Sequence, residues 1–180
     1  MEPGPLLARG WIQRLNAPTH ITPDILIAQS AVDFADGRAL FTDYAASLGV
    51  DLTFQDFAGE LRDLQRMYGA PSGCLLLARS AQATIGCIGV RALSGHDCEM
   101  KRLYVRDVAR GSGLGRTLAL RAIDWARAAG YQRMCLDTLA DMSAAQRLYA
   151  QLGFVPIEPY YRTPLSGTLF MALELTHEDS

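Results

Sequence analysis

Three glycines within five positions, flanked by arginines, are the feature of this chain whose residue types point most clearly to chemistry. They lie in the run Arg110-Gly-Ser-Gly-Leu-Gly115, and Arg116 follows directly. A glycine-rich turn that leads into a helix presents unpaired N–H groups and the positive end of the helix dipole to one spot. Cations in the first helical turn oppose that dipole unless an anion lies between them. The run therefore predicts a phosphate site; the alternative is a tight strand-to-helix turn with solvated arginines.

Two common phosphate-binding loops do not fit this run. A dinucleotide fingerprint needs G-x-G-x-x-G, but the sixth position counted from Gly111 is Arg116. A Walker A loop needs four residues between its glycines and then a lysine, whereas Gly111 and Gly115 enclose three residues. The pattern R-x-x-G-x-G at Arg110, Gly113 and Gly115 instead resembles the coenzyme A pyrophosphate loop of the GNAT superfamily of acyl-CoA-dependent N-acyltransferases.

A second motif near the C-terminus supports the same resemblance. The run Ala144-Ala-Gln-Arg-Leu-Tyr-Ala-Gln-Leu-Gly-Phe154 is similar to the family's A-x-x-L-Y-x-x-L-G-F segment. Ser143 and Gln146 have the spacing of a capping box at the start of this helix. The chain departs from the family at Met142, where many members have an asparagine, so that side-chain contact to the cofactor is not expected here.

The resemblance implies an enzyme that transfers an acetyl group from acetyl-CoA to a primary amine. The amine of a small molecule or peptide would attack directly in a ternary complex, with no metal and no covalent enzyme intermediate. A different class of function stays open, namely a non-catalytic acyl-CoA-binding module that senses the cofactor or scaffolds a partner. The sequence does not identify the acceptor.

The resemblance also implies which residues hold the cofactor. The backbone N–H of Leu103 would stabilise the oxyanion, and Val105 would hold the pantetheine amide through its main chain. The implied cofactor-binding residues are Leu103, Tyr104, Val105, Arg110, Gly111, Ser112, Gly113, Leu114, Gly115, Arg116 and Thr117.

Two side chains are candidates for proton transfer. An alkyl amine with a pKa of about 10.4 is neutral in only about one molecule in 2,500 at pH 7, so a base is useful. Glu99, eleven residues before Arg110, occupies the position of a glutamate base in several family members and would act through water. Its alternative is a solvated strand residue or one in a salt bridge with Lys101 or Arg102. Tyr149 matches the family's general acid, and its alternative is core packing.

These residues need a strand before the glycine loop and a helix after it. Apolar periodicity predicts strands at 25–31, 74–79, 84–91, 98–105, 133–137 and 168–175, and helices at 33–48, 54–68, 114–129 and 144–152. The fold class is therefore α/β. By resemblance, it is a single GNAT-like domain with a mixed, mostly antiparallel sheet, splayed at the acyl-CoA site and flanked by helices on both faces.

The acceptor pocket is expected outside the motifs. The candidates are aromatic residues on the first two helices and in the segment 156–164, namely Phe41, Tyr44, Phe54, Tyr160 and Tyr161. Aromatic residues at helical spacing are more often core than substrate contacts, whereas paired tyrosines in a proline-flanked loop are better pocket candidates.

Composition bounds the remaining possibilities. The chain has 180 residues, 49% of them hydrophobic, and a net charge of −2, which predicts one domain and disfavours nucleic acid and anionic membranes as partners. Four scattered cysteines are expected to fill the core, and no metal site is indicated. We expect an N-terminal extension at 1–22, the catalytic domain at 23–176, a tail at 177–180 and a cytoplasmic location. A homodimer is a family analogy.

Overall fold

A seven-stranded sheet runs through residues 23–175, the part of the chain that the computed structural model describes. The strand order is β1-β2-β3-β4-β5-β7-β6, and only the pair β4–β5 is parallel. The strands are β1 Asp24–Ile27, β2 Cys74–Arg79, β3 Thr84–Ser94, β4 Asp97–Val105, β5 Arg133–Thr138, β6 Val155–Pro156 and β7 Leu169–Glu174. The helices are α1 Ala31–Leu48, α2 Phe57–Arg62, α3 Leu64–Tyr68, α4 Leu114–Ala128 and α5 Ser143–Gln151, with short 3-10 turns η2 Thr53–Gln55 and η3 Asp107–Ala109.

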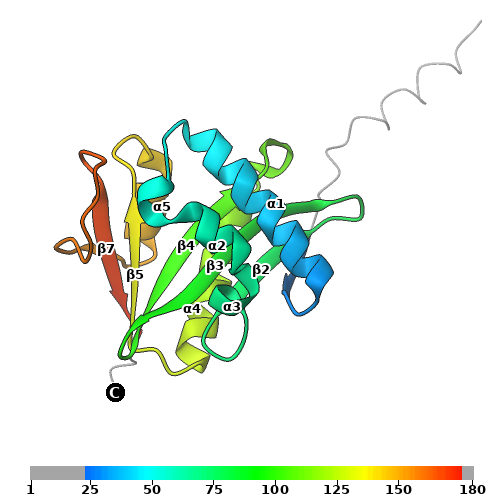
Figure 1. Ribbon diagram of the computed structural model, residues 1–180, viewed down its shortest axis with the longest axis horizontal. Coiled ribbons are helices and arrows are strands. Elements are labelled where there is room, and N and C mark those ends of the chain that lie inside the picture. The colour runs from blue at the N-terminus through cyan, green and yellow to red at the C-terminus, as the bar shows by residue number, and fades with distance from the viewer. Residues whose placement is uncertain (1–22, 176–180) are drawn as a thin grey trace, which may run out of the picture.

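Helices cover both faces of the sheet (Figure 1). Helices α1, α2 and α3 lie on one face, and α4 and α5 lie on the other. Alternation along β2 divides the core accordingly, because Leu75 and Leu77 pack in the cluster with α1, whereas Leu76 packs in the cluster with α4. The predicted α/β fold with a mostly antiparallel sheet is confirmed.

The sheet opens between its two central strands. Strand β4 pairs with β5 only at Asp97, Cys98 and Glu99, although both strands continue beyond these residues. Figure 1 shows β4 and β5 diverging from this point like the arms of a V. Within residues 23–175, the backbone of β4 from Met100 onward therefore has no partner strand on the β5 side, as the resemblance implied.

A β-bulge lies in the open half of β4. Cys87 pairs with Tyr104 and Gly89 pairs with Lys101, so two residues of β4, Arg102 and Leu103, lie opposite a single residue of β3. Arg102 adopts a left-handed φ of 59°, which is unusual for a non-glycine residue. Such a bulge bends its strand and redirects its side chains.

A buried ion pair fixes the bulge to α2. Nη2 of Arg102 lies 2.6 Å from Oε2 of Glu60, and both side chains are almost fully buried. The guanidinium also lies 5.2 Å from the centroid of the Phe57 ring. Arg102 holds the pKa of Glu60 below its usual value even though burial alone would raise it. The carboxylate therefore stays ionised, and the bulge keeps its shape.

The helices before β2 differ from the sequence prediction. The single helix expected at 54–68 is instead η2, α2 and α3, because Asp56 has a φ of 51° and accepts a hydrogen bond from the Gly59 N–H as the cap of α2. Asp63 then separates α2 from α3. The chain therefore turns twice here, which carries Gln55 and Glu60 toward β4.

Other boundaries shift for local reasons. The first strand ends at Ile27 rather than at position 31, because Ser30 and Asp33 form a capping box that begins α1. The capping box predicted for α5 is wrong: Met142 is its cap residue, and no side chain caps it. The Gln146 side chain instead donates to the carbonyl of Leu139. Strand β6 was not predicted.

The predicted N-terminal extension at 1–22 and the C-terminal tail at 177–180 lie outside the described residues, as does position 176 at the end of the predicted domain. Between residues 23 and 175, no helix has both the length and the apolar character that crossing a membrane requires.

Candidate active site

The glycine loop leads directly into α4. Gly111 and Gly113 adopt φ values of 77° and 85°, which other residues rarely tolerate. The first helical hydrogen bond runs from the Thr117 N–H to the Gly113 carbonyl, at 3.1 Å. The N–H groups at positions 114, 115 and 116 precede that bond, so they lie at the positive end of a 15-residue helix.

Two exposed arginines flank these N–H groups. Nε of Arg110 donates to the Val105 carbonyl at 3.1 Å, and Nη1 lies 2.8 Å from Asp107. Arg116 lies in the first turn of α4, where a cation opposes the helix dipole. The N–H groups, the arginines and the left-handed glycines together fit a pyrophosphate. The hydroxyls of Ser112 and Thr117 donate to backbone carbonyls of the loop itself.

A narrow cavity of about 50 Å³ lies where β4 and β5 diverge. Its lining comes from β4, β5, α1 and α5, and consists of Tyr44, Met100, Lys101, Arg102, Leu103, Asp137, Thr138, Met142, Ala145 and Tyr149. The Thr138 hydroxyl is buried without a hydrogen-bond partner, the sole such side-chain atom among the described residues. A buried hydroxyl without a partner costs free energy, so it marks a position where a ligand could accept or donate a hydrogen bond.

Tyr149 also faces this cavity from α5. It is 7% exposed and packs edge-on against Phe154. Within residues 23–175, nothing accepts a hydrogen bond from its hydroxyl. Burial raises the pKa of Tyr149 above its usual value, so the hydroxyl stays protonated and can serve as a donor. Leu103, whose backbone N–H is implied to stabilise the oxyanion, lines the same cavity as Tyr149.

Glu99 lines a second, larger cavity of about 200 Å³. This acceptor-side cavity is lined by Phe54, Gln55, Arg91, Leu93, Glu99, Lys101, Tyr160 and Tyr161. Oε2 of Glu99 accepts from Arg91 at 2.8 Å, and Oε1 accepts from the Tyr160 hydroxyl at 2.8 Å. Glu99 is 1% exposed and forms a salt bridge, as the alternative interpretation expected, and it lies at the wall of a cavity. Its role as a base stays a prediction.

Lys101 lies between the two cavities and lines both. Its Nζ lies 3.0 Å from Oδ1 of Asp137, 3.3 Å from Oε1 of Gln55 and 3.6 Å from Oε1 of Glu99. Burial would raise the pKa of Asp137, but Lys101 holds it below its usual value. The positive charge of Lys101 between the two cavities is therefore compensated by the carboxylates of Asp137 and Glu99.

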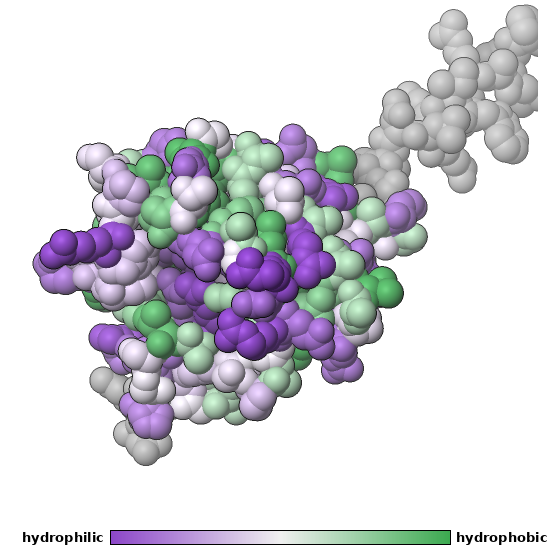
Figure 2. Space-filling view, in the orientation of Figure 1, coloured by the Kyte–Doolittle hydropathy of each residue, from purple (hydrophilic) through white to green (hydrophobic). Residues whose placement is uncertain are grey.

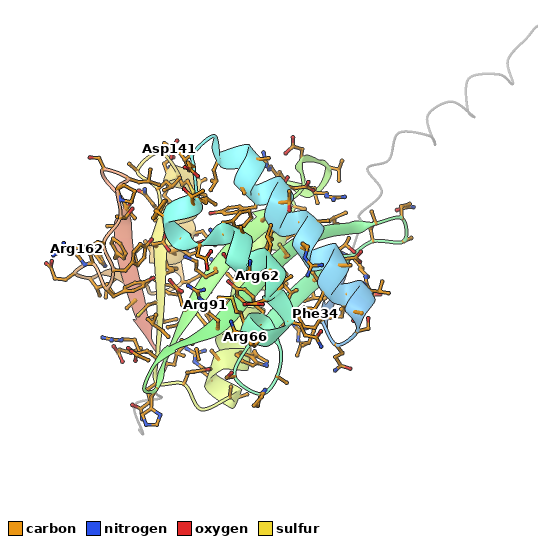
Figure 3. The ribbon with its side chains drawn as sticks, viewed as in Figure 1. Phe34, Arg62, Arg66, Arg91, Asp141 and Arg162 are labelled. Carbon is orange, nitrogen blue, oxygen red and sulfur yellow. The ribbon has the colours of Figure 1, made fainter. Side chains whose placement is uncertain are left out.

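The loop between β6 and β7 supplies an aromatic wall. The rings of Tyr160, Tyr161 and Phe170 contact one another edge-on, with centroids 5.0 to 5.4 Å apart. The Tyr161 hydroxyl accepts from the Gln55 side chain at 2.9 Å, which ties this loop to η2. Figure 3 shows the neighbouring Arg162 projecting away from the body of the protein, and its side chain is exposed.

Four of the predicted acceptor-site residues line one of the two cavities. Phe54, Tyr160 and Tyr161 line the acceptor-side cavity, and Tyr44 lines the narrow cavity. Phe41 does not, because it is fully buried against Tyr68 in the core under α1. The prediction for Phe41 is therefore wrong.

Sequence reasoning missed three polar residues of the site, Arg91, Asp137 and Thr138, and named Lys101 only as a possible ion-pair partner of Glu99. Lys101 and Arg91 lie inside predicted strands, and Asp137 and Thr138 lie at the end of β5. Two-residue alternation along the strand would have placed Lys101 on the same face as Glu99. Nothing in the sequence indicates that the Thr138 hydroxyl has no partner, because that depends on the divergence of β5 from β4.

A larger hollow, of about 400 Å³, lies elsewhere, beside α1 and the turn between β2 and β3. Its two arginines are paired: Arg79 contacts Asp33 and Asp36, and Arg106 contacts Asp43. None of the motif residues lines it. The two smaller cavities, which the motif residues do line, are therefore the candidate active site.

No group of three or more His, Cys, Asp or Glu residues within 23–175 is arranged to hold a metal ion. All four cysteines are buried, as expected for core residues, and burial raises the pKa of Cys74 to about 12.

Sequence comparisons match the chain to known proteins. The Acetyltransferase (GNAT) family matches residues 39–154. An uncharacterised N-acetyltransferase of Schizosaccharomyces pombe is 42% identical over 146 residues, which cover 80% of this chain and 90% of that protein. An IAA acetyltransferase of Azospirillum brasilense is 37% identical over 119 residues, covering 63% of this chain and 75% of that protein.

A solved structure shares the architecture. A protein of Salmonella typhimurium, solved with its cofactor acetyl-CoA, superposes with a TM-score of 0.60 at 24% identity and covers 87% of this chain and 96% of that chain. At this level of identity, the likeness concerns the fold alone.

Proposed function

This chain belongs to the GNAT family of acetyltransferases, and from that premise we propose that it transfers an acetyl group from acetyl-CoA to a primary amine by direct attack. The observation that carries the proposal is the opening between β4 and β5. It has the glycine loop near one end, and Leu103, Thr138 and Tyr149 line the cavity inside. Both substrates would meet there without a covalent enzyme intermediate.

The loop and α4 would hold the pyrophosphate of acetyl-CoA. Three N–H groups at the start of α4 would bind phosphate oxygens, and Arg110 and Arg116 would neutralise their charge. Leu103, Tyr104 and Val105 on the open arm of β4 would contact the pantetheine part. Val105 would do so from its main chain, whose carbonyl also accepts from Arg110.

The reaction has three requirements that residues around the narrow cavity can meet. Acetyl-CoA supplies an acetyl thioester: a C–N bond forms as the C–S bond breaks, the amine loses one proton, and the sulfur gains one. The Leu103 N–H at the bulge would stabilise the oxyanion, with the Thr138 hydroxyl as a second donor. Tyr149, held protonated by burial, would give its proton to the sulfur.

The attacking amine must also lose a proton, and the candidate base, Glu99, lines the acceptor-side cavity. Glu99 would receive this proton through water, and the Tyr160 hydroxyl, which lines the same cavity, would orient the carboxylate. Arg91 and Lys101 lie 2.8 Å and 3.6 Å from the Glu99 carboxylate. Because a carboxylate is an intrinsically weak base, Glu99 would act through a water relay rather than by direct contact.

Two measurements test the proposal together. Calorimetry should show saturable binding of acetyl-CoA at about micromolar affinity, roughly −8 kcal/mol, with no binding of ATP or NAD. A thiol-release assay with a panel of primary amines should then show turnover, and Tyr149→Phe should lower kcat by about 10²-fold or more without changing acetyl-CoA affinity.

The outcomes separate the two classes of function. Binding of acetyl-CoA without thiol release from any amine would favour a non-catalytic cofactor-binding module. Binding of ATP or NAD in place of acetyl-CoA would refute the loop assignment. Unchanged turnover in Tyr149→Phe would remove that residue from the mechanism while leaving the transferase activity in place.

A further inference from the structure

The acceptor-side cavity has a polar floor and apolar walls. Arg91, Glu99, Lys101 and Gln55 bring the charged and amide groups, and the walls are Phe54, Leu93 and the rings of Tyr160 and Tyr161. Its volume of about 200 Å³ is smaller than the 300 to 1,000 Å³ typical of pockets for drug-sized ligands. The cavity therefore suits a small molecule with one polar end and an apolar body.

The carboxylates near the floor are already engaged. Glu99 accepts hydrogen bonds from Tyr160 and Arg91 and lies 3.6 Å from Lys101. Asp137 accepts a hydrogen bond from Lys101, and Lys101 and the nearby Tyr161 hydroxyl lower its pKa. An acceptor that carries a second ammonium group would meet Arg91 and Lys101 without finding a carboxylate to pair with. This arrangement disfavours polyamines and other multiply charged cations.

Arg91 is the cation that an acceptor can reach. Its side chain is 25% exposed, whereas that of Lys101 is 5% exposed and surrounded by three oxygen atoms. Nε and Nη2 of Arg91 both contact the same oxygen of Glu99, at 2.8 Å each. The pair therefore uses one edge of the guanidinium, and Nη1 has no partner among residues 23–175.

The second edge of a guanidinium can bind a carboxylate through two parallel hydrogen bonds. Figure 3 shows Arg91 over the same face of the sheet as α2 and α3, where Figure 2 shows hydrophilic residues gathered around the middle of the face. The Leu93 side chain, at 36% exposure, continues the apolar wall outward from Arg91 along β3. A negatively charged group at Arg91 would thus lie beside an apolar surface.

We propose that the amine acceptor is a small amino acid, with its carboxylate bound by the free edge of Arg91 and its apolar skeleton packed against Phe54, Leu93, Tyr160 and Tyr161. This inference rests on the proposed acetyl transfer and names its substrate class. It excludes polyamines and lysine side chains of proteins as the preferred acceptors.

Matched pairs of acids and amides provide the test. Leucine and leucinamide, phenylalanine and phenylalaninamide, and 6-aminohexanoate and its amide serve as acceptors in the thiol-release assay, together with spermidine and a lysine-containing peptide. The acid of at least one pair should exceed its amide at least tenfold in kcat/KM. An α-amino amide has a larger neutral fraction near pH 7 than the acid, so this bias runs against the expected result.

Binding gives a readout that is independent of turnover. Calorimetry with N-acetyl-leucine and N-acetyl-leucinamide, in the presence and absence of coenzyme A, should show the acid binding at least tenfold more tightly. The same comparison applies to the N-acetylated products of the pair that gives the larger ratio in the assay. Equal affinities for the acid and the amide would overturn the proposal.

Substitutions then locate the effect. Arg91→Met should bring the acid-to-amide ratio of kcat/KM toward one. Arg91→Lys keeps the positive charge but lacks the paired N–H groups of the guanidinium, so it should give an intermediate ratio. Arg66→Met is the control, because Arg66 pairs with Asp63 on α3 with 76% of its side chain exposed and lies outside the cavity (Figure 3). Its ratio should match that of the unmodified protein.

Different outcomes would refute the acetyltransferase activity and the amino-acid acceptor. No thiol release with any amine would refute the transferase proposal. Turnover with spermidine or the peptide at rates equal to the best acid, or ratios near one in all pairs, would refute only the amino-acid acceptor. A ratio above tenfold that persists in both Arg91 variants would remove Arg91 from the carboxylate site.

Discussion

At the scale of single residues, the Thr138 hydroxyl is a group whose presence folding does not explain. A buried hydroxyl without a partner costs roughly 1 to 3 kcal/mol, so its presence at the narrow cavity does not stabilise the free protein. Folding alone would favour an apolar side chain of the same shape. We therefore infer that the Thr138 hydroxyl forms a hydrogen bond to a ligand when one occupies the narrow cavity.

Thr138→Val tests this attribution. Because valine has the shape of threonine without the hydroxyl, the free energy of unfolding in urea should stay equal or rise by about 1 kcal/mol. Acetyl-CoA affinity by calorimetry or kcat by thiol release should fall, while Thr138→Ser should retain most of both. A valine variant that binds and turns over like the original protein would show that the hydroxyl contacts no ligand.

At the scale of elements, the two ends of α4 form a natural comparison. Gly113 is the cap residue before the helix and Gly130 follows its end, both have a φ of 85°, and a Cβ at either position would meet no atom within 4 Å. A side chain at either position thus carries a similar backbone cost, roughly 1 to 2 kcal/mol. The two sites differ in what they face, since only Gly113 lies in the proposed phosphate site.

Gly113→Asp and Gly130→Asp should therefore lose similar stability but differ in binding. The carboxylate at position 113 would repel a pyrophosphate, so acetyl-CoA affinity should fall at least 100-fold by calorimetry. Gly130→Asp should bind acetyl-CoA normally at a temperature where it is folded. Normal binding by folded Gly113→Asp would refute the assignment of the loop.

The bulge in β4 and its anchor on α2 form another unit at this scale. Glu60→Gln removes the charge opposite Arg102, and breaking a buried pair in this way costs about 3 to 5 kcal/mol. Urea unfolding at pH 7 measures this loss. The exposed Glu174→Gln should change the free energy of unfolding by less than about 0.5 kcal/mol.

The pH dependence of the same pair has a definite sign. The pKa of Glu60 is lower in the folded protein than in the unfolded chain, so its contribution to stability is present above pH 4.5, the ordinary value for this group. That contribution is lost as pH falls below 4.5. The difference in unfolding free energy between the original protein and Glu60→Gln should therefore shrink in acid, and a constant difference from pH 7 to pH 3 would contradict the assignment.

At the scale of the whole molecule, a ligand between β4 and β5 would connect the two arms of the sheet. Acetyl-CoA at 100 times its Kd should raise the free energy of unfolding by about 2.7 kcal/mol. For a chain of this size that corresponds to roughly 5 to 11 °C in Tm. Differential scanning calorimetry checks the shift, and ATP or NAD at the same concentration should leave Tm unchanged.

Much of this architecture follows from local patterns. The glycine loop, the helix after it, the strands around it and the positions of Tyr149 and Leu103 rest on residue spacing together with family resemblance, and all of them have counterparts in the structure. The break of the second helix at Asp56 was missed because a left-handed aspartate leaves no periodic signal. The apolar spacing on either side of it continues as if the helix were unbroken.

The missed parts of the site depend on contacts between distant segments. Lys101 belongs to both cavities because Gln55, Asp137 and Glu99 converge on it from three elements. Phe41 and Phe54 have the same residue type in neighbouring helical segments, yet one is core and the other lines a cavity. Only the turns at η2 and α2 decide between them, and those turns are themselves tertiary features.

The short pairing of β4 with β5 has a consequence for backbone amide exchange with deuterium. Three residue pairs join these strands, whereas β5 and β7 pair along six residues. Opening the sheet at this seam breaks few hydrogen bonds, so the region from β5 to β7 should become accessible to deuterium through openings smaller than global unfolding. Amides of β3, which lies between two long antiparallel partners, should exchange last. Amides of the region from β5 to β7 would thus exchange at one set of rates and those of β3 at a slower set. A ligand bound between β4 and β5 would suppress the local opening and make the two sets of rates similar.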